Sequence, residues 1–393
     1  MSTLYDQLCE MGLVFQLLLG VLGLFFFIQL FYYIYYYSAP LKALKSPSSK
    51  DNEKLPPVSI IVCAQNEAEN LKQFIPKLLE QKYPNKFEVI VVNDGSTDES
   101  AEVLERMAQE HSNLKISFLP RAAKYMSRKK MCLSIGIKAA AYDVYLFTDA
   151  DCCPSSQLWL EIMVRNLNNS NDVVLGATRF NKLEGMIGNL IDYDNLFNTI
   201  RYMGYALRGN IFRGTIRNMA YKKNIYYKAK GFSKHLDLDT GEDDILLKDA
   251  NVKDNVCVEL NSNAITICNR QLTAKSYRLM KEQRLDNRKF YRTGTRFSLS
   301  FENVSRILFY LLTIALVVFA TLECQWLALG ITAFLFLARY ITQAVVMSKN
   351  AKWLGCKAHP LGIIFFDFYL PIYEQYLNTI GRIGRKRWEM WRE

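Results

Sequence analysis

Two carboxylates separated by one small residue follow an apolar run in the first half of the chain. Residues 144–148 read Val-Tyr-Leu-Phe-Thr and lead into Asp149, Ala150 and Asp151. Such a run is typical of a buried parallel strand, and α/β sheets carry their chemistry at the carboxyl ends of strands. On an extended strand Asp149 and Asp151 would share one face, where they can hold a hard divalent cation beside phosphate oxygens. A pair of acids in a turn before a helix is the simpler interpretation, so the context must decide.

Two further apolar runs also end in polar residues. These ends are Ala64-Gln65-Asn66-Glu67 after residues 58–63, and Asn93-Asp94-Gly95 after residues 87–92. Asn66 with Glu69, and Ser96 with Glu99, have the spacing of helix-capping pairs. Residues 114–119 predict another strand and 129–141 another helix. Strands that alternate with helices at this spacing predict an α/β fold with a doubly wound, mainly parallel sheet.

Charged clusters follow at two later places. Arg128-Lys129-Lys130 precedes the predicted helix at 129–141, and Gly241-Glu242-Asp243-Asp244 is expected to open another helix. A diphosphate needs cationic partners, which the basic cluster can supply. The acidic cluster can serve as a general base, although carboxylates at a helix N-terminus are also simply good partners of the helix dipole.

Composition narrows the class of protein. The chain has 393 residues, half of them apolar, and a net charge of +11. The basic residues gather beside long apolar segments, which indicates an anionic membrane face, and no nucleic-acid-binding module is recognisable. Nine cysteines at irregular spacings form neither a zinc pattern nor a disulfide framework, which favours a reducing compartment.

Long apolar segments flank the predicted α/β domain, which we place at residues 56–300. Residues 12–37 predict an N-terminal transmembrane helix, and residues 304–348 predict two more, separated at Glu323. Asp6 and Glu10 precede the first segment, whereas Lys42 and Lys45 follow it. By the positive-inside bias the N-terminus lies outside and the α/β domain lies in the cytoplasm, as a multi-pass protein of the cell inner membrane.

The C-terminal segment, residues 361–393, is apolar but contains Asp367, Pro371 and Glu374 and ends in a basic tail. A full crossing would place that tail outside, so we expect an amphipathic helix on the cytoplasmic interface. Arg339, within the third apolar segment, is expected to snorkel toward the interface.

These motifs, in this order, resemble the membrane-bound branch of glycosyltransferase family 2, whose domain has the GT-A fold. The branch includes cellulose, chitin and hyaluronan synthases and non-processive relatives. The resemblance covers residues 57 to about 300, about 60% of the chain.

The resemblance implies a role for each motif. Ala64, Asn66, Glu67 and Asp94 would contact the nucleoside of a nucleotide diphosphate sugar. Lys129, with Lys130 and Arg128 close behind, would contact the diphosphate. Asp149 and Asp151 would hold Mg²⁺ or Mn²⁺. Asp243 would be the general base, with Glu242 beside it and Asp244 as the alternative base if the register slips by one residue.

One motif departs from the family pattern. Processive members carry a Gln-x-x-Arg-Trp sequence, whereas this chain has Gln283-Arg284-Leu285-Asp286-Asn287 and lacks both the Arg and the Trp. Gln283 is kept, and Arg284 or Arg288 can still serve the diphosphate. The missing Trp and the small number of spans argue against a channel for a long polymer.

The resemblance therefore implies an inverting, metal-dependent glycosyltransferase. Its donor would be a nucleotide diphosphate sugar, first of all a UDP-sugar, and its acceptor a lipid-linked sugar or surface glycan at the membrane. Two alternatives remain: a processive polysaccharide synthase, and a non-catalytic membrane scaffold with a glycosyltransferase-like domain. Product length separates the first from our interpretation, and turnover separates the second.

Overall fold

The computed structural model describes residues 12–45, 55–120, 127–167, 170–235, 238, 240–252, 255–357 and 360–389, the last ten of these by their backbone alone. Asp6, Glu10 and the side chains of the basic tail, on which part of the topology prediction rests, lie outside this description.

A sheet of seven strands forms the centre of the α/β domain, in the order β3-β2-β1-β4-β8-β6-β9. Its strands are β1 (Val58–Ala64), β2 (Phe87–Asn93), β3 (Leu114–Phe118), β4 (Val144–Asp149), β6 (Val173–Leu175), β8 (Met219–Lys222) and β9 (Val256–Val258). The strands β3, β2, β1 and β4 are parallel, whereas β8 runs antiparallel to both β4 and β6. The predicted α/β class with a mainly parallel sheet is confirmed.

A second sheet of three strands continues from the end of β4. It contains β5 (Cys152–Pro154), β7 (Thr178–Phe180) and β10 (Thr266–Cys268), in the order β5-β10-β7. β4 ends at Asp149, and Ala150 and Asp151 form a turn before β5. The strand alternation expected to place Asp149 and Asp151 on one face therefore does not apply, because the extended backbone stops at the first carboxylate.

Helices cover both faces of the large sheet. The helices of the α/β domain are α4 (Ala68–Leu79), α5 (Ser100–Glu110), α6 (Arg128–Ala139), α7 (Trp159–Val164), α8 (Gly185–Ala206), α9 (Lys223–Lys228), α10 (Ile245–Asp249) and α11 (Ala274–Asn287). Ile60 of β1 packs with α4, α5 and α7, while its neighbour Ile61 packs with α6. Because both faces are covered, the parallel strands are continuous apolar runs rather than alternating ones.

The predicted capping pairs at Asn66 and Ser96 are wrong. α4 begins at Ala68 and α5 at Ser100. Asn66, at φ +54°, instead donates its backbone N–H to Ser96 Oγ (2.9 Å), and its side-chain oxygen accepts from the backbone N–H of Thr97 (2.7 Å). A left-handed backbone is tolerated well by Asn. The two residues thus join the loop after β1 to the loop after β2.

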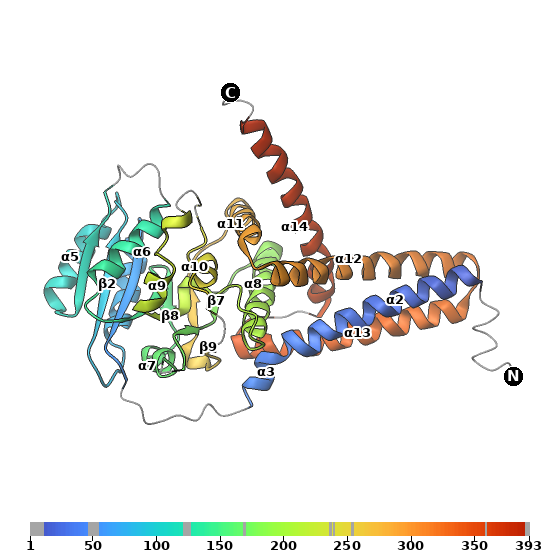
Figure 1. Ribbon diagram of the computed structural model, residues 1–393, viewed down its shortest axis with the longest axis horizontal. Coiled ribbons are helices and arrows are strands. Elements are labelled where there is room, and N and C mark those ends of the chain that lie inside the picture. Colours follow the sequence, from blue (N-terminus) through green and yellow to red (C-terminus); the bar gives the residue numbers. More distant parts are fainter. Residues whose placement is uncertain are drawn as a thin grey trace.

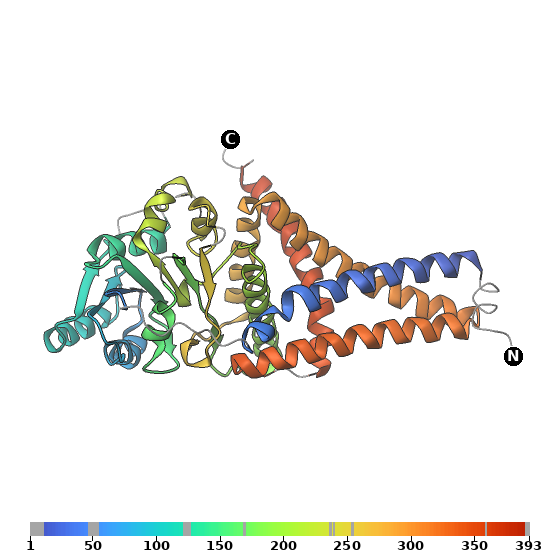
Figure 2. The ribbon, with the colours of Figure 1, turned by 60° about the horizontal axis from the view of Figure 1, so that its bottom comes forward.

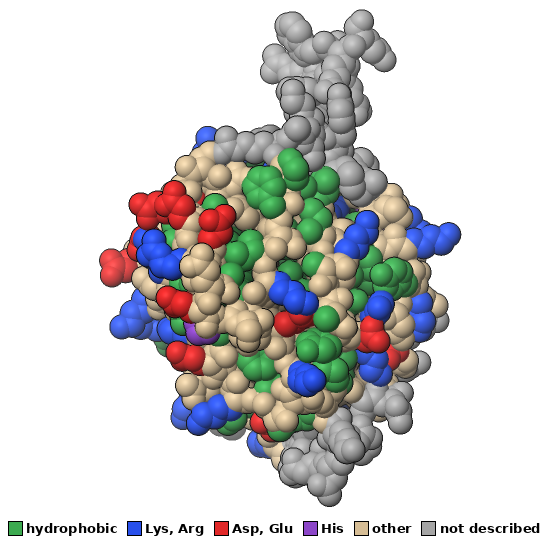
Figure 3. Space-filling view, turned by 90° about the vertical axis from the view of Figure 1, so that its left-hand side faces the viewer, with side chains coloured by type: hydrophobic (Ala, Val, Ile, Leu, Met, Phe, Trp, Pro, Cys, Tyr) green, Lys and Arg blue, Asp and Glu red, His purple; other side chains and the backbone are tan. Residues whose placement is uncertain are grey.

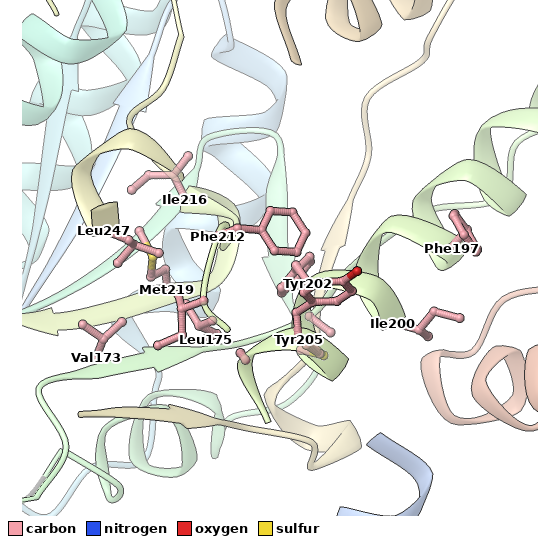
Figure 4. Packing of buried hydrophobic residues seen from close by; sticks show 14 of the residues in the cluster. Val173, Leu175, Phe197, Ile200, Tyr202, Tyr205, Phe212, Ile216, Met219 and Leu247 are labelled. Atoms are coloured by element: carbon pink, nitrogen blue, oxygen red, sulfur yellow. The ribbon is translucent and has the colours of Figure 1, made fainter. Parts of the chain in front are cut away.

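The core of the antiparallel half extends from the sheet onto α8. Leu175 of β6 and Met219 of β8 are fully buried, and they belong to the same cluster as Phe197, Ile200 and Tyr202 of α8 (Figure 4). This continuous packing makes α8 the link between the sheet and the helices beyond it (Figure 1).

Three helices are long and apolar enough to cross a membrane, by length and composition: Leu13–Ala43, Thr293–Leu322 and Trp326–Leu354. The first consists of α2 (Leu13–Phe31), a π-helix (Tyr32–Tyr37) and α3 (Ala39–Ala43), and the others are α12 and α13. They lie side by side and extend away from the α/β domain (Figures 1 and 2). At the far end of that domain, acidic and basic side chains are intermixed over the described surface (Figure 3).

The last helix, α14 (Pro360–Glu389), leaves the three apolar helices at a steep angle (Figure 1). Its Asp367 is fully buried and pairs with Arg339 of α13 at 2.7 Å and with Arg306 of α12 at 3.2 Å. The prediction that Arg339 snorkels is therefore wrong. A buried carboxylate from another helix satisfies its charge.

The π-helix touches the α/β domain directly. The ring of Tyr36 stacks on Tyr205 of α8 with a centroid distance of 4.0 Å. A Cβ at Gly204 would overlap the carbonyl oxygen of Tyr36, so only glycine allows this approach. The first apolar helix is thus fixed against the element that supports the antiparallel half of the sheet.

Candidate active site

Two adjoining cavities open at the carboxyl ends of the central strands. The first cavity, of about 200 Å³, is lined by Ala64, Glu67, Asp94, Lys129, Asp149 and Asp151, among others. The second cavity, of about 340 Å³, is lined by residues that include Arg213, Arg217, Glu242, Asp243, Asp244 and Arg284. Lys129, Asp149 and Arg270 line both, so the two cavities meet at these side chains.

Parallel strands bring the first cavity together. Ala64 ends β1, Asp149 ends β4, and Asp94 follows β2, with its backbone N–H donating to the carbonyl of Ala64 (2.8 Å). Asp94 is 7% exposed and forms an ion pair with Arg128 at the start of α6. A buried carboxylate beside a cavity can accept hydrogen bonds from a ligand's N–H or O–H groups.

Asp149 is held by two cations at the junction of the cavities. Its carboxylate lies 3.0 Å from Lys129 Nζ and 3.1 Å from Arg217 Nε. Burial alone would raise the pKa of Asp149, but Lys129 and Arg217 outweigh it and hold that pKa below its usual value. Asp149 is therefore an anion that is already balanced by protein charges.

Asp151 has weaker partners. It is 6% exposed, and among the described residues its Oδ1 accepts from the thiol of Cys152 (3.3 Å), while its Oδ2 lies 3.9 Å from Arg270 Nε. A buried carboxylate without a close cation suits a hard divalent ion such as Mg²⁺ or Mn²⁺. Of the two predicted metal ligands, Asp151 fits such an ion better than Asp149 does.

Cys152 and Cys268 complete a group of three side chains around Asp151 whose ligand atoms lie within 4.8 Å of one another. Both cysteines are buried, and burial together with Cys268 raises the pKa of Cys152 well above its usual value. A thiol that keeps its proton is a poor metal ligand, and oxygen donors suit Mg²⁺ and Mn²⁺ better. The remaining ligands would therefore come from a bound diphosphate.

The acidic cluster before α10 stands on the wall of the second cavity. Residues 242–244 form a turn, and α10 begins only at Ile245, with Asp244 as its N-cap. The expectation that a helix opens at Gly241 is therefore wrong by four residues. Gly241 adopts φ +113°, which a residue with a side chain rarely tolerates, at the start of this turn.

The three carboxylates of this turn have different surroundings. Glu242 Oε1 lies 3.6 Å from Lys129 Nζ, and Asp243 Oδ2 lies 3.8 Å from Arg213. Asp244 is 2% exposed and accepts from Ile245 N (2.8 Å) and Tyr291 Oη (2.9 Å).

Burial also changes the pKa values of two of these carboxylates, Glu242 and Asp244. Burial raises the pKa of Glu242, although Lys129 opposes the rise. Burial and the neighbouring Asp243 raise the pKa of Asp244 to about 7. All three acids line the second cavity, but Asp244 is engaged by Ile245 N and Tyr291, and Glu242 lies near Lys129.

The remaining predicted site residues divide between the cavities. Glu67 lines the first cavity, and Asn66 lies in a shallower depression beside it. Gln283 and Arg284 line the second cavity. Lys130 lines neither, because it is buried and its ammonium donates to the carbonyls of His235 (2.8 Å) and Leu238 (2.6 Å). Its predicted contact with the diphosphate is corrected accordingly.

Sequence reasoning missed three arginines of the site. None of the motifs singled out in the sequence includes Arg213 or Arg217. Arg270 follows β10 and lies next to Asp151 in the structure. No spacing in the sequence could have indicated this, because 119 positions separate Arg270 from Asp151.

Comparison with known proteins places these motifs in a family. The model of the family described as Glycosyl transferase family 2 matches residues 59–233. The chain is 28% identical over 185 residues to Glycosyltransferase AglE of Haloferax volcanii, an alignment that covers 46% of this chain and 58% of that protein. It is 26% identical over 130 residues to poly-beta-1,6-N-acetyl-D-glucosamine synthase of Staphylococcus epidermidis, covering 33% of this chain and 30% of the synthase. The matched part is thus well under two thirds of either relative.

A solved structure is similar over a greater length. The mannosyltransferase PcManGT from Pyrobaculum calidifontis, in complex with GDP-Man and Mn²⁺, aligns with a TM-score of 0.55 and covers 90% of this chain and 99% of that one. At 18% identity this likeness concerns the fold. Residues 59–233 thus match a glycosyltransferase family 2 domain, and the strand order together with the likeness to PcManGT shows a fold of the GT-A type.

Proposed function

We propose that the protein transfers a sugar, with inversion, from a nucleotide diphosphate sugar to a lipid-linked or surface-glycan acceptor at a membrane. One observation carries the proposal: a carboxylate-lined cavity at the strand ends meets a second cavity, with Asp243 on its wall, at Lys129 and Asp149. A donor and an acceptor that occupied the two cavities would meet at that junction.

The first cavity suits the donor. Asp94 and Glu67 offer carboxylate oxygens to the N–H and O–H groups of a nucleoside. Lys129 and Arg270 line both cavities at their junction, where they would contact the diphosphate. UDP-sugars are our first choice, and the neighbour bound to GDP-Man supports testing guanosine donors as well.

A divalent ion held by Asp151, with Asp149 beside it, would neutralise charge on the departing diphosphate. Lys129 shares this task from the protein side. Asp149 and Glu242 counter burial and raise the pKa of Lys129, so its ammonium stays charged. Asp149 in turn keeps that ammonium at the junction of the two cavities.

Asp243 is the proposed general base. It would accept the proton of an acceptor hydroxyl while that oxygen attacks the anomeric carbon. A single displacement inverts the configuration there. Arg213 lies 3.8 Å from the Oδ2 atom of Asp243 on the wall of the same cavity.

The apolar helices would hold the domain at a bilayer. The expected arrangement, with the N-terminus outside and α14 on the cytoplasmic interface of an inner membrane, is part of this proposal. Similarity to a poly-N-acetylglucosamine synthase favours a processive synthase as the second candidate, and product length distinguishes the two.

The test is turnover of a panel of UDP-, GDP- and dTDP-sugars by the purified full chain, with Mn²⁺, with Mg²⁺ or with chelator. We expect release of one nucleoside diphosphate, dependent on the ion. If no donor in the panel is hydrolysed or transferred under any of these conditions, the non-catalytic scaffold replaces the enzyme.

A further inference from the structure

A small third cavity of about 20 Å³ lies between the glycosyltransferase domain and the apolar helices. Elements α8, α11, α12 and α14 all contribute to it, and α8 and α11 lie between the sheet and those helices (Figure 1). Its charged lining consists of Arg201, Arg213, Lys281, Arg284, Arg288 and Glu374, which is five cations and one carboxylate.

The nearby carboxylates are already engaged by two of these cations. Lys281 lies 2.8 Å from Asp194 and 2.7 Å from Glu374, and Arg288 lies 2.7 Å from the other oxygen of Glu374. These are distances of charge-assisted hydrogen bonds. Lys281 and Arg288 are therefore satisfied within the protein.

The other three cations, Arg201, Arg213 and Arg284, are not paired in this way. Their nearest carboxylates lie at 3.8 Å for Arg201, 3.8 Å for Arg213 and 3.7 Å for Arg284. Among the described residues, Nε of Arg201 and Nε of Arg213 are buried without a hydrogen-bond partner. Arg201 is only 4% exposed.

Crowding of like charges is also visible in the pKa values of two of the three, whereas Asp243 outweighs burial and raises the pKa of Arg213. Burial, followed by the neighbouring Arg213, lowers the pKa of Arg284 to about 10. Burial, followed by Arg288, lowers the pKa of Arg201. Buried cations are normally paired, so an arrangement that places three loosely paired guanidiniums together suits an anion supplied from outside.

We propose that Arg201, Arg213 and Arg284 form a binding subsite for the phosphate group of a lipid acceptor. This inference rests on the proposed function and names the class of its acceptor. Arg213 and Arg284 also line the second cavity, which contains Asp243 and measures about 340 Å³. A phosphate there would occupy the second cavity and direct one oxygen into the small one, which has room for about one water-sized atom.

Guanidinium groups fit this ligand by geometry. Their planar fork donates two parallel hydrogen bonds to phosphate oxygens, which a lysine ammonium cannot do. The chain places arginines at all three loosely paired positions and a lysine, Lys281, where two carboxylates are the partners.

The location favours a lipid over a soluble anion. Leu299, which lines the small cavity, belongs to α12, and the same helix continues as a candidate membrane span. A phosphate attached to a lipid lies at the level where such a span leaves the bilayer. A subsite beside the start of this helix would be within reach of a lipid phosphate, and its Arg213 lies 3.8 Å from the proposed base, Asp243.

The experiment measures thermal stabilisation of the purified full chain in neutral detergent, because a ligand of the folded state raises its melting temperature. The probes are farnesyl phosphate, farnesol and inorganic phosphate, each without donor. We expect saturable stabilisation by farnesyl phosphate at far lower concentration than by the other two. Equal stabilisation by farnesol would mean an apolar groove, and equal stabilisation by inorganic phosphate would mean a site for free anions; either result overturns the lipid phosphate.

Single substitutions test which side chains are needed for stabilisation by farnesyl phosphate. Arg284→Gln and Arg213→Gln should each weaken the farnesyl phosphate response about tenfold or more, as expected for a lost charged hydrogen bond. Arg284→Lys keeps the charge but loses the fork, and should give an intermediate response. Arg278→Gln is the matched control, because Arg278 lies on the same helix but is exposed and pairs with Glu282. An unchanged response in both glutamine variants, with unliganded melting temperatures near that of the wild type, would refute the subsite.

A second readout separates this inference from the proposed function. UDP and GDP, with Mn²⁺, are titrated against the same variants. If Arg284→Gln weakens nucleotide diphosphate binding as much as farnesyl phosphate binding, Arg284 belongs to the donor site and the inference fails while the enzyme stands. If the protein turns over no donor but still shows a normal farnesyl phosphate response, the proposed enzyme fails while the phosphate subsite stands.

Discussion

The first cavity takes its polar side chains from the ends of parallel strands. The second takes them from the turn at residues 242–244, from the segment that precedes β8, and from α11. Ala64, Asp94 and Asp149 lie at equivalent ends of β1, β2 and β4. Arg213, Asp243 and Arg284 come from segments with no common pattern. Strand ends in a parallel sheet meet at one edge by construction, whereas the second cavity also needs the side chains of α11, which no strand positions.

The two cavities also differ in the charge of the side chains that line them. Carboxylates predominate in the first, where a metal ion and a cationic pair would balance a diphosphate. Arg213 and Arg284 line the second, and their nearest carboxylates lie 3.8 Å and 3.7 Å away. On the proposals made above, the two halves of the site would bind different anions: one together with a metal ion, the other directly.

The largest effect is expected in the first cavity. Asp151→Asn should abolish ion-dependent turnover, because a neutral amide cannot balance the charge of an ion and a diphosphate. The measurement is donor hydrolysis against Mn²⁺ concentration. Asp143→Asn is the control, since Asp143 is an exposed partner of Lys223 near the same strand. If Asp151→Asn kept its ion-dependent turnover, Asp151 would not be a ligand of a metal ion in the first cavity.

In the second cavity, Asp243→Asn should lower kcat by about 10²- to 10⁴-fold with donor affinity nearly unchanged, because a general base acts in the chemical step. Asp244→Asn should be milder, since Asp244 caps α10 and bonds to Tyr291. Steady-state kinetics on both variants is the measurement. An inactive Asp244→Asn beside a nearly normal Asp243→Asn would shift the base by one residue.

The contribution of Asp367 to the packing of α12, α13 and α14 can be tested by substitution. Asp367→Asn leaves Arg306 and Arg339 without their shared carboxylate and should lower the free energy of unfolding by about 3–5 kcal/mol. Thermal unfolding in detergent measures it, with Glu282→Gln, half of an exposed pair, as a control expected to change it by less than about 1 kcal/mol. Nucleotide binding should survive in the folded fraction. Equal stability of the two variants would mean that the buried pair does not hold the helices together.

The smallest effect concerns pH. The pKa of Asp244 is about 7 in the folded protein, above its unfolded value near 3.8. The folded state therefore binds this proton more tightly, and its stabilising contribution is complete below about pH 4 and lost as pH rises through about 7. Melting temperatures between pH 5 and 8 should fall more steeply in the wild type than in Asp244→Asn. Parallel slopes would contradict the raised pKa.

Much of the first cavity could be predicted from local pattern. Apolar runs that end in Ala64, Asp94 and Asp149 indicated parallel strands, and side chains that follow such strands lie together whatever the loops do. The same reasoning failed at finer scale. Asn66 and Ser96 have the residue types of helix caps, yet they bond to each other's loops, because the two strand ends lie close enough for a tertiary contact to replace a local one.

The amino-acid sequence by itself determined the α/β class, the three apolar helices and the acids of the candidate site, because periodicity and residue type act over a few positions. Only the tertiary structure decided which charges meet. Arg270 reaches Asp151, Lys130 turns away to backbone carbonyls, and Arg339 pairs with Asp367 on another helix. Each of these outcomes depends on distances across packed elements, and a charge pattern along the chain contains no record of those distances.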